Sequence, residues 1–226
     1  MNVKQIIIEL EKHIPFTGVG VVTGIIFMIL FRGISSNTAC RMFHIFHPIH
    51  VFLSALVTAS MLKVHRDESN SEKCNFLEIL LIGIMGAVGI ATLSDSVIPY
   101  VGEVLLHLPN RGVHIGFIEK WWLVFPCAIL GITVAHFCPR TKFPHAGHVL
   151  LSTWASLFHI ITALGQSLTW GIYVGIFVFL FLSVWLPCCV SDIVFPLVFV
   201  QKSVKIGLDK DNQLINTKSK SNRCIT

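Results

Sequence analysis

The histidines best placed to do chemistry occur in two pairs of nearly the same sequence. The motifs read His47-Pro-Ile-His50-Val-Phe-Leu-Ser54 and His145-Ala-Gly-His148-Val-Leu-Leu-Ser152. At a spacing of three, both imidazoles of a pair lie on one helical face, and the serine joins that face. Neutral imidazole is a preferred ligand of transition-metal ions. A single pair could instead hydrogen-bond to lipid headgroups or backbone, but the duplication favours a ligand role.

An aspartate motif follows each histidine pair. The two copies are Leu93-Ser94-Asp95-Ser-Val-Ile-Pro99 and Val190-Ser191-Asp192-Ile-Val-Phe-Pro196. A proline four residues after each aspartate cannot donate to the aspartate's own carbonyl, so we predict a helix break that frees this oxygen. Carboxylate, carbonyl and hydroxyl oxygens would then lie within one turn, and all of them attract cations. The alternative is a simple proline kink, with each aspartate near the membrane surface and paired to an Arg or Lys.

Four further side chains extend these motifs. They are His44, His159, Cys188 and Cys189. His44 lies one turn before the first histidine pair, and His159 lies on roughly the same helical face as the second pair. The two cysteines precede the second aspartate motif and could supply soft thiolates. The four histidines of the two pairs and the two aspartates form a nitrogen and oxygen donor set that suits a divalent transition metal such as Zn, Mn, Fe, Co or Ni. Helix N-termini at the histidines would favour an anion instead, which leaves an anionic substrate open.

The elements that must position these residues are membrane helices. Hydrophobic residues make up 54% of the chain, charged residues only 13%, and the mean hydropathy is +0.74. About 20 apolar residues of helix cross a bilayer, so we predict an all-α integral membrane protein with about six transmembrane helices. The predicted helices cover residues 15–31, 43–62, 76–99, 121–137, 145–164 and part of 168–200. Residues 1–14 are predicted to form a short surface helix.

The duplicated motifs indicate an internal repeat of the chain. Residues 1–100 form the first three-helix unit, 101–118 an extracytoplasmic connecting loop, 119–200 the second unit, and 201–226 a polar, disordered cytoplasmic tail. Three crossings per unit predict two inverted repeats. On this topology one side carries 13 of the 17 Lys and Arg residues, which places both termini in the cytoplasm, in a plasma or inner membrane. The net charge of +5 therefore reflects topology and not nucleic-acid binding.

Three functions are compatible with these patterns, as is a structural or assembly protein whose duplicated motifs only shape helix breaks. The leading hypothesis is a transporter, alone or as a homodimer, that moves a divalent transition-metal ion by alternating access, with possible proton coupling through Asp95 and Asp192. The first alternative is an intramembrane metal-dependent hydrolase acting on a lipid-like substrate, which needs one asymmetric site with a separate general base. The second is a permease for an anion or small molecule. The symmetric spread of polar residues favours transport over enzymatic activity.

Overall fold

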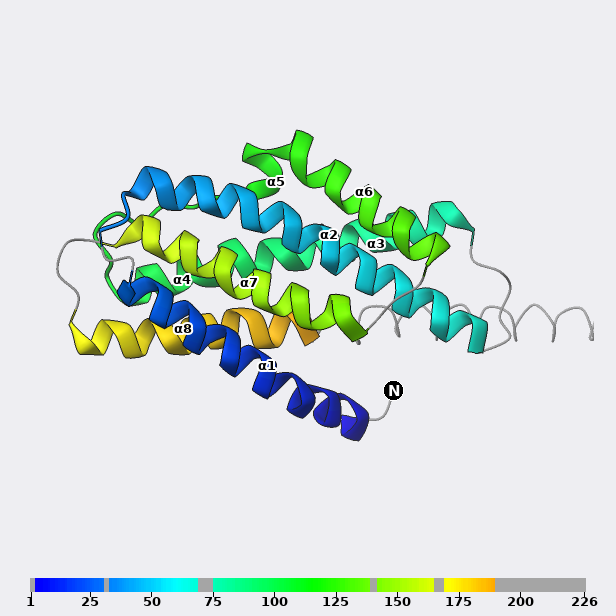
Figure 1. Ribbon diagram of the computed structural model, residues 1–226, viewed down its shortest axis with the longest axis horizontal. Helices are drawn as coiled ribbons and strands as arrows, with labels where there is room; N and C mark the ends of the chain where they lie inside the picture. Colours follow the sequence, from blue (N-terminus) through cyan, green and yellow to red (C-terminus); the bar gives the residue numbers. More distant parts are fainter. Residues whose placement is uncertain (1–2, 31–32, 69–74, 139–141, 165–168, 190–226) are drawn as a thin grey trace, which may run out of the picture.

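The protein folds as a bundle of helices in a computed structural model (Figure 1). The structure describes residues 3–30, 33–68, 75–138, 142–164 and 169–189. Within these ranges there is no β-strand, so the predicted all-helical class is confirmed. The elements are α1 (Val3–Leu30), α2 (Ser36–Glu68), α3 (Phe76–Thr92), the π-helix η1 (Leu93–Val97), α4 (Ile98–Leu105), α5 (Gly116–Glu119), α6 (Trp121–Phe137), α7 (Lys142–Ala163) and α8 (Trp170–Cys189).

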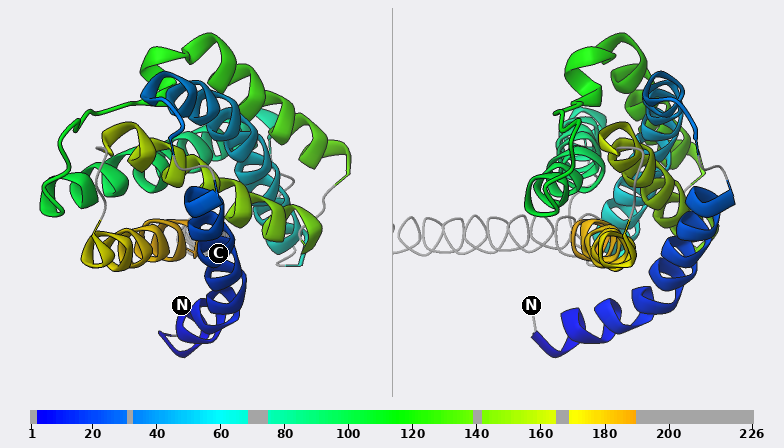
Figure 2. Two further views of the ribbon diagram at one scale, coloured as in Figure 1. Left: turned by 60° about the vertical axis from the view of Figure 1, so that its left-hand side comes forward. Right: turned by 90° about the vertical axis from the view of Figure 1, so that its left-hand side faces the viewer.

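Helix α2 lies at the centre of the bundle. It packs most extensively against α7 and α6, and next against α3, while α1 and α8 pack against each other and against α7 (Figures 1 and 2). Gly131 of α6 allows a close approach to α2, because a side chain there would collide with the Phe52 carbonyl oxygen. The first unit of the predicted repeat therefore meets the second along α2.

Four helical segments are long and apolar enough to cross a membrane. They are Ser36–Val64, Phe76–Leu105, Ala146–Ala163 and Trp170–Cys188. Two shorter apolar helices, Ile14–Leu30 and Trp121–Phe137, have 17 residues each, a length of about 25 Å at 1.5 Å per residue. These lengths are consistent with a helical membrane protein. The six crossings, their inversion and the position of the termini stay predictions.

Helix α1 differs from the predicted arrangement. The sequence predicts a surface helix over residues 1–14 followed by a separate crossing, but α1 runs without interruption from Val3 to Leu30 with Pro15 inside it. Its N-terminal part extends away from the other helices (Figure 2). The first part of this helix therefore contributes little to the bundle that holds the candidate site.

The helix between residues 76 and 105 continues through Pro99 and does not break there. Proline has no N–H and crowds the preceding turn, and the backbone accommodates it by widening into η1. The N–H of Ile98 donates to the Leu93 carbonyl, five residues back, and α4 then continues to Leu105. The helical run consequently extends into the segment 101–118 that was predicted to be a loop.

Polar side chains are buried on the facing surfaces of α2, η1 and α7. Apolar clusters lie on both sides, one built from α2, α3 and α6 and the other from α1, α7, α8 and the start of α2. Burial of polar groups in such surroundings is costly unless they are hydrogen-bonded. The hydrogen-bond partners of these buried polar side chains identify the candidate site.

Candidate metal centre

Asp95 is fully buried in η1 and accepts four hydrogen bonds. On Oδ2 the partners are Nδ1 of His47 at 2.9 Å and Nδ1 of His50 at 2.7 Å. On Oδ1 they are the hydroxyls of Ser94 at 2.7 Å and Ser152 at 2.8 Å. Four donors around two oxygens suit an ionised carboxylate, which can accept and cannot donate. Both Nδ1 atoms must then carry their imidazole's proton.

The local sequence explains how these side chains meet. His47 and His50 lie one turn apart on α2, so their rings project from the same face. In η1 the Ile98 N–H bypasses the Ser94 carbonyl, which it would bind in a regular α-helix. The hydroxyl of Ser156 on α7 donates to that carbonyl at 3.0 Å. The π turn thus places Asp95 toward α2 and fastens η1 to α7.

One carbonyl of η1 accepts a side-chain donor, and it is not the carbonyl that Pro99 was expected to free. Pro99 was expected to free the carbonyl of Asp95, four residues before it. The structure shows Ser156 bound to the carbonyl of Ser94, because the wide turn shifts the backbone hydrogen bonding by one residue. The alternative of a surface aspartate paired with Arg or Lys does not hold for Asp95, which is buried among histidines and serines.

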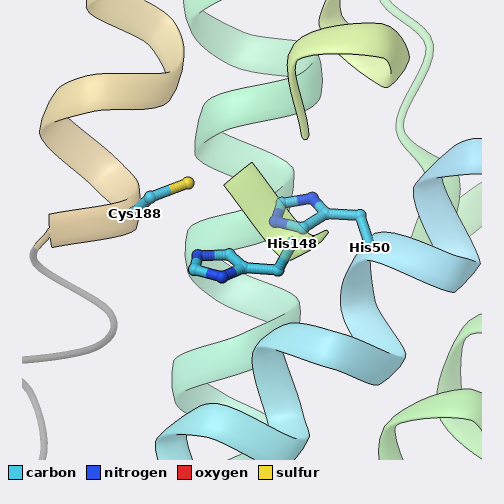
Figure 3. A group of neighbouring side chains, drawn as sticks. All are labelled: His50, His148 and Cys188. Carbon is cyan, nitrogen blue, oxygen red and sulfur yellow. The ribbon is translucent and has the colours of Figure 1, made fainter. Parts of the chain in front are cut away.

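A second group of possible ligands shares His50 with the first. His148 of α7 stacks on His50 with 5.8 Å between ring centroids and 12° between ring planes. Cys188 of α8 completes the group, and one ligating atom from each of the three residues lies within 4.8 Å of the others. All three are buried, and their side chains converge from α2, α7 and α8 (Figure 3). His47, His50 and Asp95 satisfy the same distance limit.

The structure brings most of the described site residues into one cluster. His47, His50, Asp95 and Ser94 come from the first copy of the motifs, and they meet His148 and Ser152 from the second copy and Cys188, which precedes the second aspartate motif. Ser54 is buried on α2, one turn beyond His50. The side chains of His145 and Cys189, and all of Ser191, Asp192 and Pro196, lie outside the described residues. The predicted second aspartate site is therefore untested.

His159 joins a different buried carboxylate. The backbone N–H of His114 donates to Nε2 of His159 at 3.3 Å, so the ring proton resides on Nδ1. Nδ1 donates to Oε1 of Glu103 at 2.8 Å, and Glu103 Oε2 accepts the N–H of Gly112 at 3.3 Å. Glu103 and His159 are both fully buried. This pair ties the 108–116 connection to α4 and α7.

Sequence reasoning missed the role of Glu103, which falls in the segment 101–118 that was expected to be an extracytoplasmic connecting loop. One signal could have indicated its partner: His159 lies seven residues after Ser152 and hence on the same helical face. His44 also has a carboxylate partner, since its Nε2 lies 3.0 Å from Oε2 of Glu119. Oε1 of Glu119 lies 3.2 Å from Nδ1 of His114. His44 and His159 therefore contact carboxylates other than Asp95.

The N-terminal residue of α5 covers the histidine end of the cluster. A Cβ on Gly116 would overlap the ring of His47 and come within 2.6 Å of its Nε2. This Nε2 is buried and has no hydrogen-bond partner among the described residues. Because Nδ1 carries the ring proton, Nε2 keeps its lone pair and can accept a hydrogen bond. The backbone of Gly116 covers this nitrogen.

The chain was compared with protein families, with curated proteins and with solved structures, and none of them matches it.

Proposed function

We propose that the protein is a membrane transporter for a divalent transition-metal ion and that His47, His50 and Asp95 form its ion-binding site. The observation that supports this proposal best is the fully buried carboxylate of Asp95 between two imidazoles. Within membrane helices, buried ionisable groups mark substrate or ion pathways by default. A bound cation would offset the cost of burying this negative charge.

The proton inventory of the site permits a cation to bind without the release of a proton. Each neutral imidazole has one proton, which the hydrogen bonds to Asp95 place on Nδ1. A cation bound by Asp95 and the two Nδ1 atoms would displace these protons. In His47 the displaced proton can occupy Nε2, which has no hydrogen-bond partner among the described residues. The site can therefore change between a hydrogen-bonded and an ion-bound form while its ligands stay in place.

The donor chemistry supports a transition-metal ion as the substrate. Two imidazole nitrogens and one carboxylate oxygen suit Zn²⁺, Mn²⁺, Fe²⁺, Co²⁺ or Ni²⁺. Mg²⁺ and Ca²⁺ prefer sites made of oxygens. Two serine hydroxyls hold the other carboxylate oxygen and so orient Asp95 toward the histidines.

The position of the site between the two units supports transport. Asp95 bonds to His47 and His50 of the first unit and to Ser152 of the second. In transporters built from inverted repeats, ions bind at the interface between repeats, and rocking of one repeat against the other gives alternating access. A relative movement of α2 and α7 would change the environment of Asp95 directly. The proposed repeats thus have a shared site on which such movement can act.

Metal-dependent hydrolysis is the second candidate, and one observation favours it. The described cluster is asymmetric, because His47, His50 and Asp95 all come from the first unit. A hydrolase needs such a single site, together with a general base separate from the ligands. In the described part of the chain Glu103 is such a separate carboxylate, but it is engaged by His159 and Gly112. We therefore place hydrolysis second.

A flux assay with purified protein in liposomes tests the proposal. Each metal is added outside vesicles that contain a metal indicator, and wild type is compared with Asp95→Asn. Removal of residues that bind or orient a metal costs about 10- to 100-fold in affinity or activity, so flux at limiting metal should fall at least about 10-fold. Glu78→Gln is the matched control. It removes a carboxylate near the start of α3, in the same continuous helical segment as Asp95 but 17 residues before it.

Equal flux in Asp95→Asn and wild type would refute the proposed site. Absence of flux for every metal, together with hydrolysis of a lipid ester that requires Asp95, would favour the second candidate. Each sample is checked for a single symmetric peak in size-exclusion chromatography, so that a loss of flux is not confused with a loss of fold.

A further inference from the structure

His50 belongs to both groups of possible ligands. Its Nδ1 lies 2.7 Å from Asp95 Oδ2, while the ring also stacks on His148 and approaches Cys188. With the ring proton on Nδ1, the lone pair of His50 is on Nε2. A histidine that donates its second nitrogen to a carboxylate is the usual arrangement of a metal ligand, because the carboxylate fixes the tautomer and makes the ring more basic.

We infer that His50, His148 and Cys188 form a second metal site, adjacent to the first, which takes a thiophilic ion such as Zn²⁺, Cd²⁺ or Cu⁺. The three ligating atoms lie within 4.8 Å of one another, and all three residues are buried. The residues come from three helices, so the site depends on the packing of α2, α7 and α8 (Figure 3). Binding removes one proton from the thiol, because the thiolate is the ligand.

The thiolate narrows the class of substrate. Soft sulfur ligands select Zn²⁺ and Cu⁺, whereas Mn²⁺ and Mg²⁺ favour carboxylate and water. The inference rests on the proposed function, since it names the ions that would be transported. A protein with this second site should prefer Zn²⁺ or Cd²⁺ over Mn²⁺, although the first site alone would admit all of the divalent transition metals.

The shared imidazole makes the two sites mutually exclusive. The first site needs the lone pair of His50 on Nδ1, and the second needs it on Nε2. A neutral imidazole has one lone pair in the ring plane, so His50 serves one ion at a time. The structure, with Nδ1 bonded to Asp95, has the tautomer that the second site requires. One ion per chain is therefore expected, and it can pass from one site to the other as the His50 proton changes nitrogen.

Cobalt binding to the purified full-length protein tests this inference. Protein stripped with a chelator is titrated with Co²⁺, which gives a near-ultraviolet charge-transfer band when a thiolate is a ligand. Wild type should bind one ion per chain and show the band, and Cys188→Ser should lose it. Cys127→Ser is the matched control, because Cys127 lies on α6 outside the cluster and its loss should leave the band unchanged.

Several results would overturn the inference. These are Co²⁺ bound without the band, a band that persists in Cys188→Ser, a band lost in Cys189→Ser but not in Cys188→Ser, two ions per chain, and no bound ion. A normal band with no flux in liposomes would support the site and refute the transport proposal. Flux that depends on Asp95 but occurs without any band would support the transport proposal and refute the second site.

Discussion

Replacement of Asp95 by Asn or by Ala should separate its role in the fold from its role in metal binding. The Asn amide oxygen can accept from both Nδ1 atoms, and its NH₂ can donate to the hydroxyls of Ser94 and Ser152, which accept as well as donate. The Ser94 hydroxyl can then donate to the Ala91 carbonyl at 3.1 Å, and the Ser152 hydroxyl to Ser94 Oγ at 3.3 Å, so no buried donor of the cluster loses its partner. The Ala variant offers no acceptor at all.

The magnitudes follow from the same four hydrogen bonds. In Asp95→Asn two charge-assisted bonds from His47 and His50 become neutral, a loss of about 1 kcal/mol each. Relief from burying an ion offsets that loss, so the free energy of unfolding should change by less than about 2 kcal/mol. In Asp95→Ala each imidazole N–H is left unsatisfied, at about 1 to 3 kcal/mol per group. The total cost is about 2 to 6 kcal/mol, while the two hydroxyls, 3.3 Å apart, can bond to each other.

Thermal unfolding of the metal-free proteins in detergent provides the assay, followed by metal titration of each. We expect Asp95→Asn to unfold close to wild type and Asp95→Ala to unfold at a clearly lower temperature. Both should lose at least about 10-fold in affinity for the metal. If Asp95→Asn unfolds as early as Asp95→Ala, the ionised carboxylate is structural and the hydrogen-bond argument is wrong. If Asp95→Asn retains full affinity, Asp95 is not part of the metal site.

Two further substitutions test the parts that hold the cluster. Ser156→Ala removes the donor to the Ser94 carbonyl and should lower the free energy of unfolding by about 1 to 3 kcal/mol. The free energy of metal binding should change by less than this amount. An unchanged unfolding temperature would show that water replaces the hydroxyl. Gly116→Ala should displace the His47 ring and weaken metal binding, whereas Gly112→Ala, whose added Cβ would meet its nearest neighbour at 3.6 Å, should bind normally. Equal affinities of these two glycine variants in a metal titration would contradict the placement of α5 over the site.

The sequence predicted the helices well because their signal is local. Apolar segments of about 20 residues can satisfy their backbone groups only as helices, so residues 43–62, 76–99 and 121–137, and all but the last residue of 145–164, lie in helices as expected. The end of the third segment could not be predicted in the same way. Whether Pro99 ends a helix or is absorbed by a π turn depends on a donor for the bypassed carbonyl, and Ser156 supplies it from a helix some 60 residues later.

The candidate site was predictable in composition and not in arrangement. The spacing of His47 and His50 indicated a shared face, and the apolar sequence around Asp95 indicated a functional carboxylate. Two contacts could not be predicted, because they depend on how α2 and α7 pack, which local patterns do not encode. These are the bond of Ser152 to Asp95 and the stacking of His148 on His50. The same packing explains the error at Glu103, since the helix that continues past Pro99 carries this carboxylate inward to His159.

Contacts between the two units at Asp95 bear directly on how an ion could drive movement. An ion shifts a conformational equilibrium only as far as it binds one state more tightly than another. Asp95 and His50 of the first unit touch Ser152 and His148 of the second, so a displacement of α7 against α2 would alter the orientation of the carboxylate and the access to His50. If these groups bind a cation as proposed, the ion would favour the arrangement in which these contacts are intact. The ion-free protein would lose that bias, and its two units would be freer to separate.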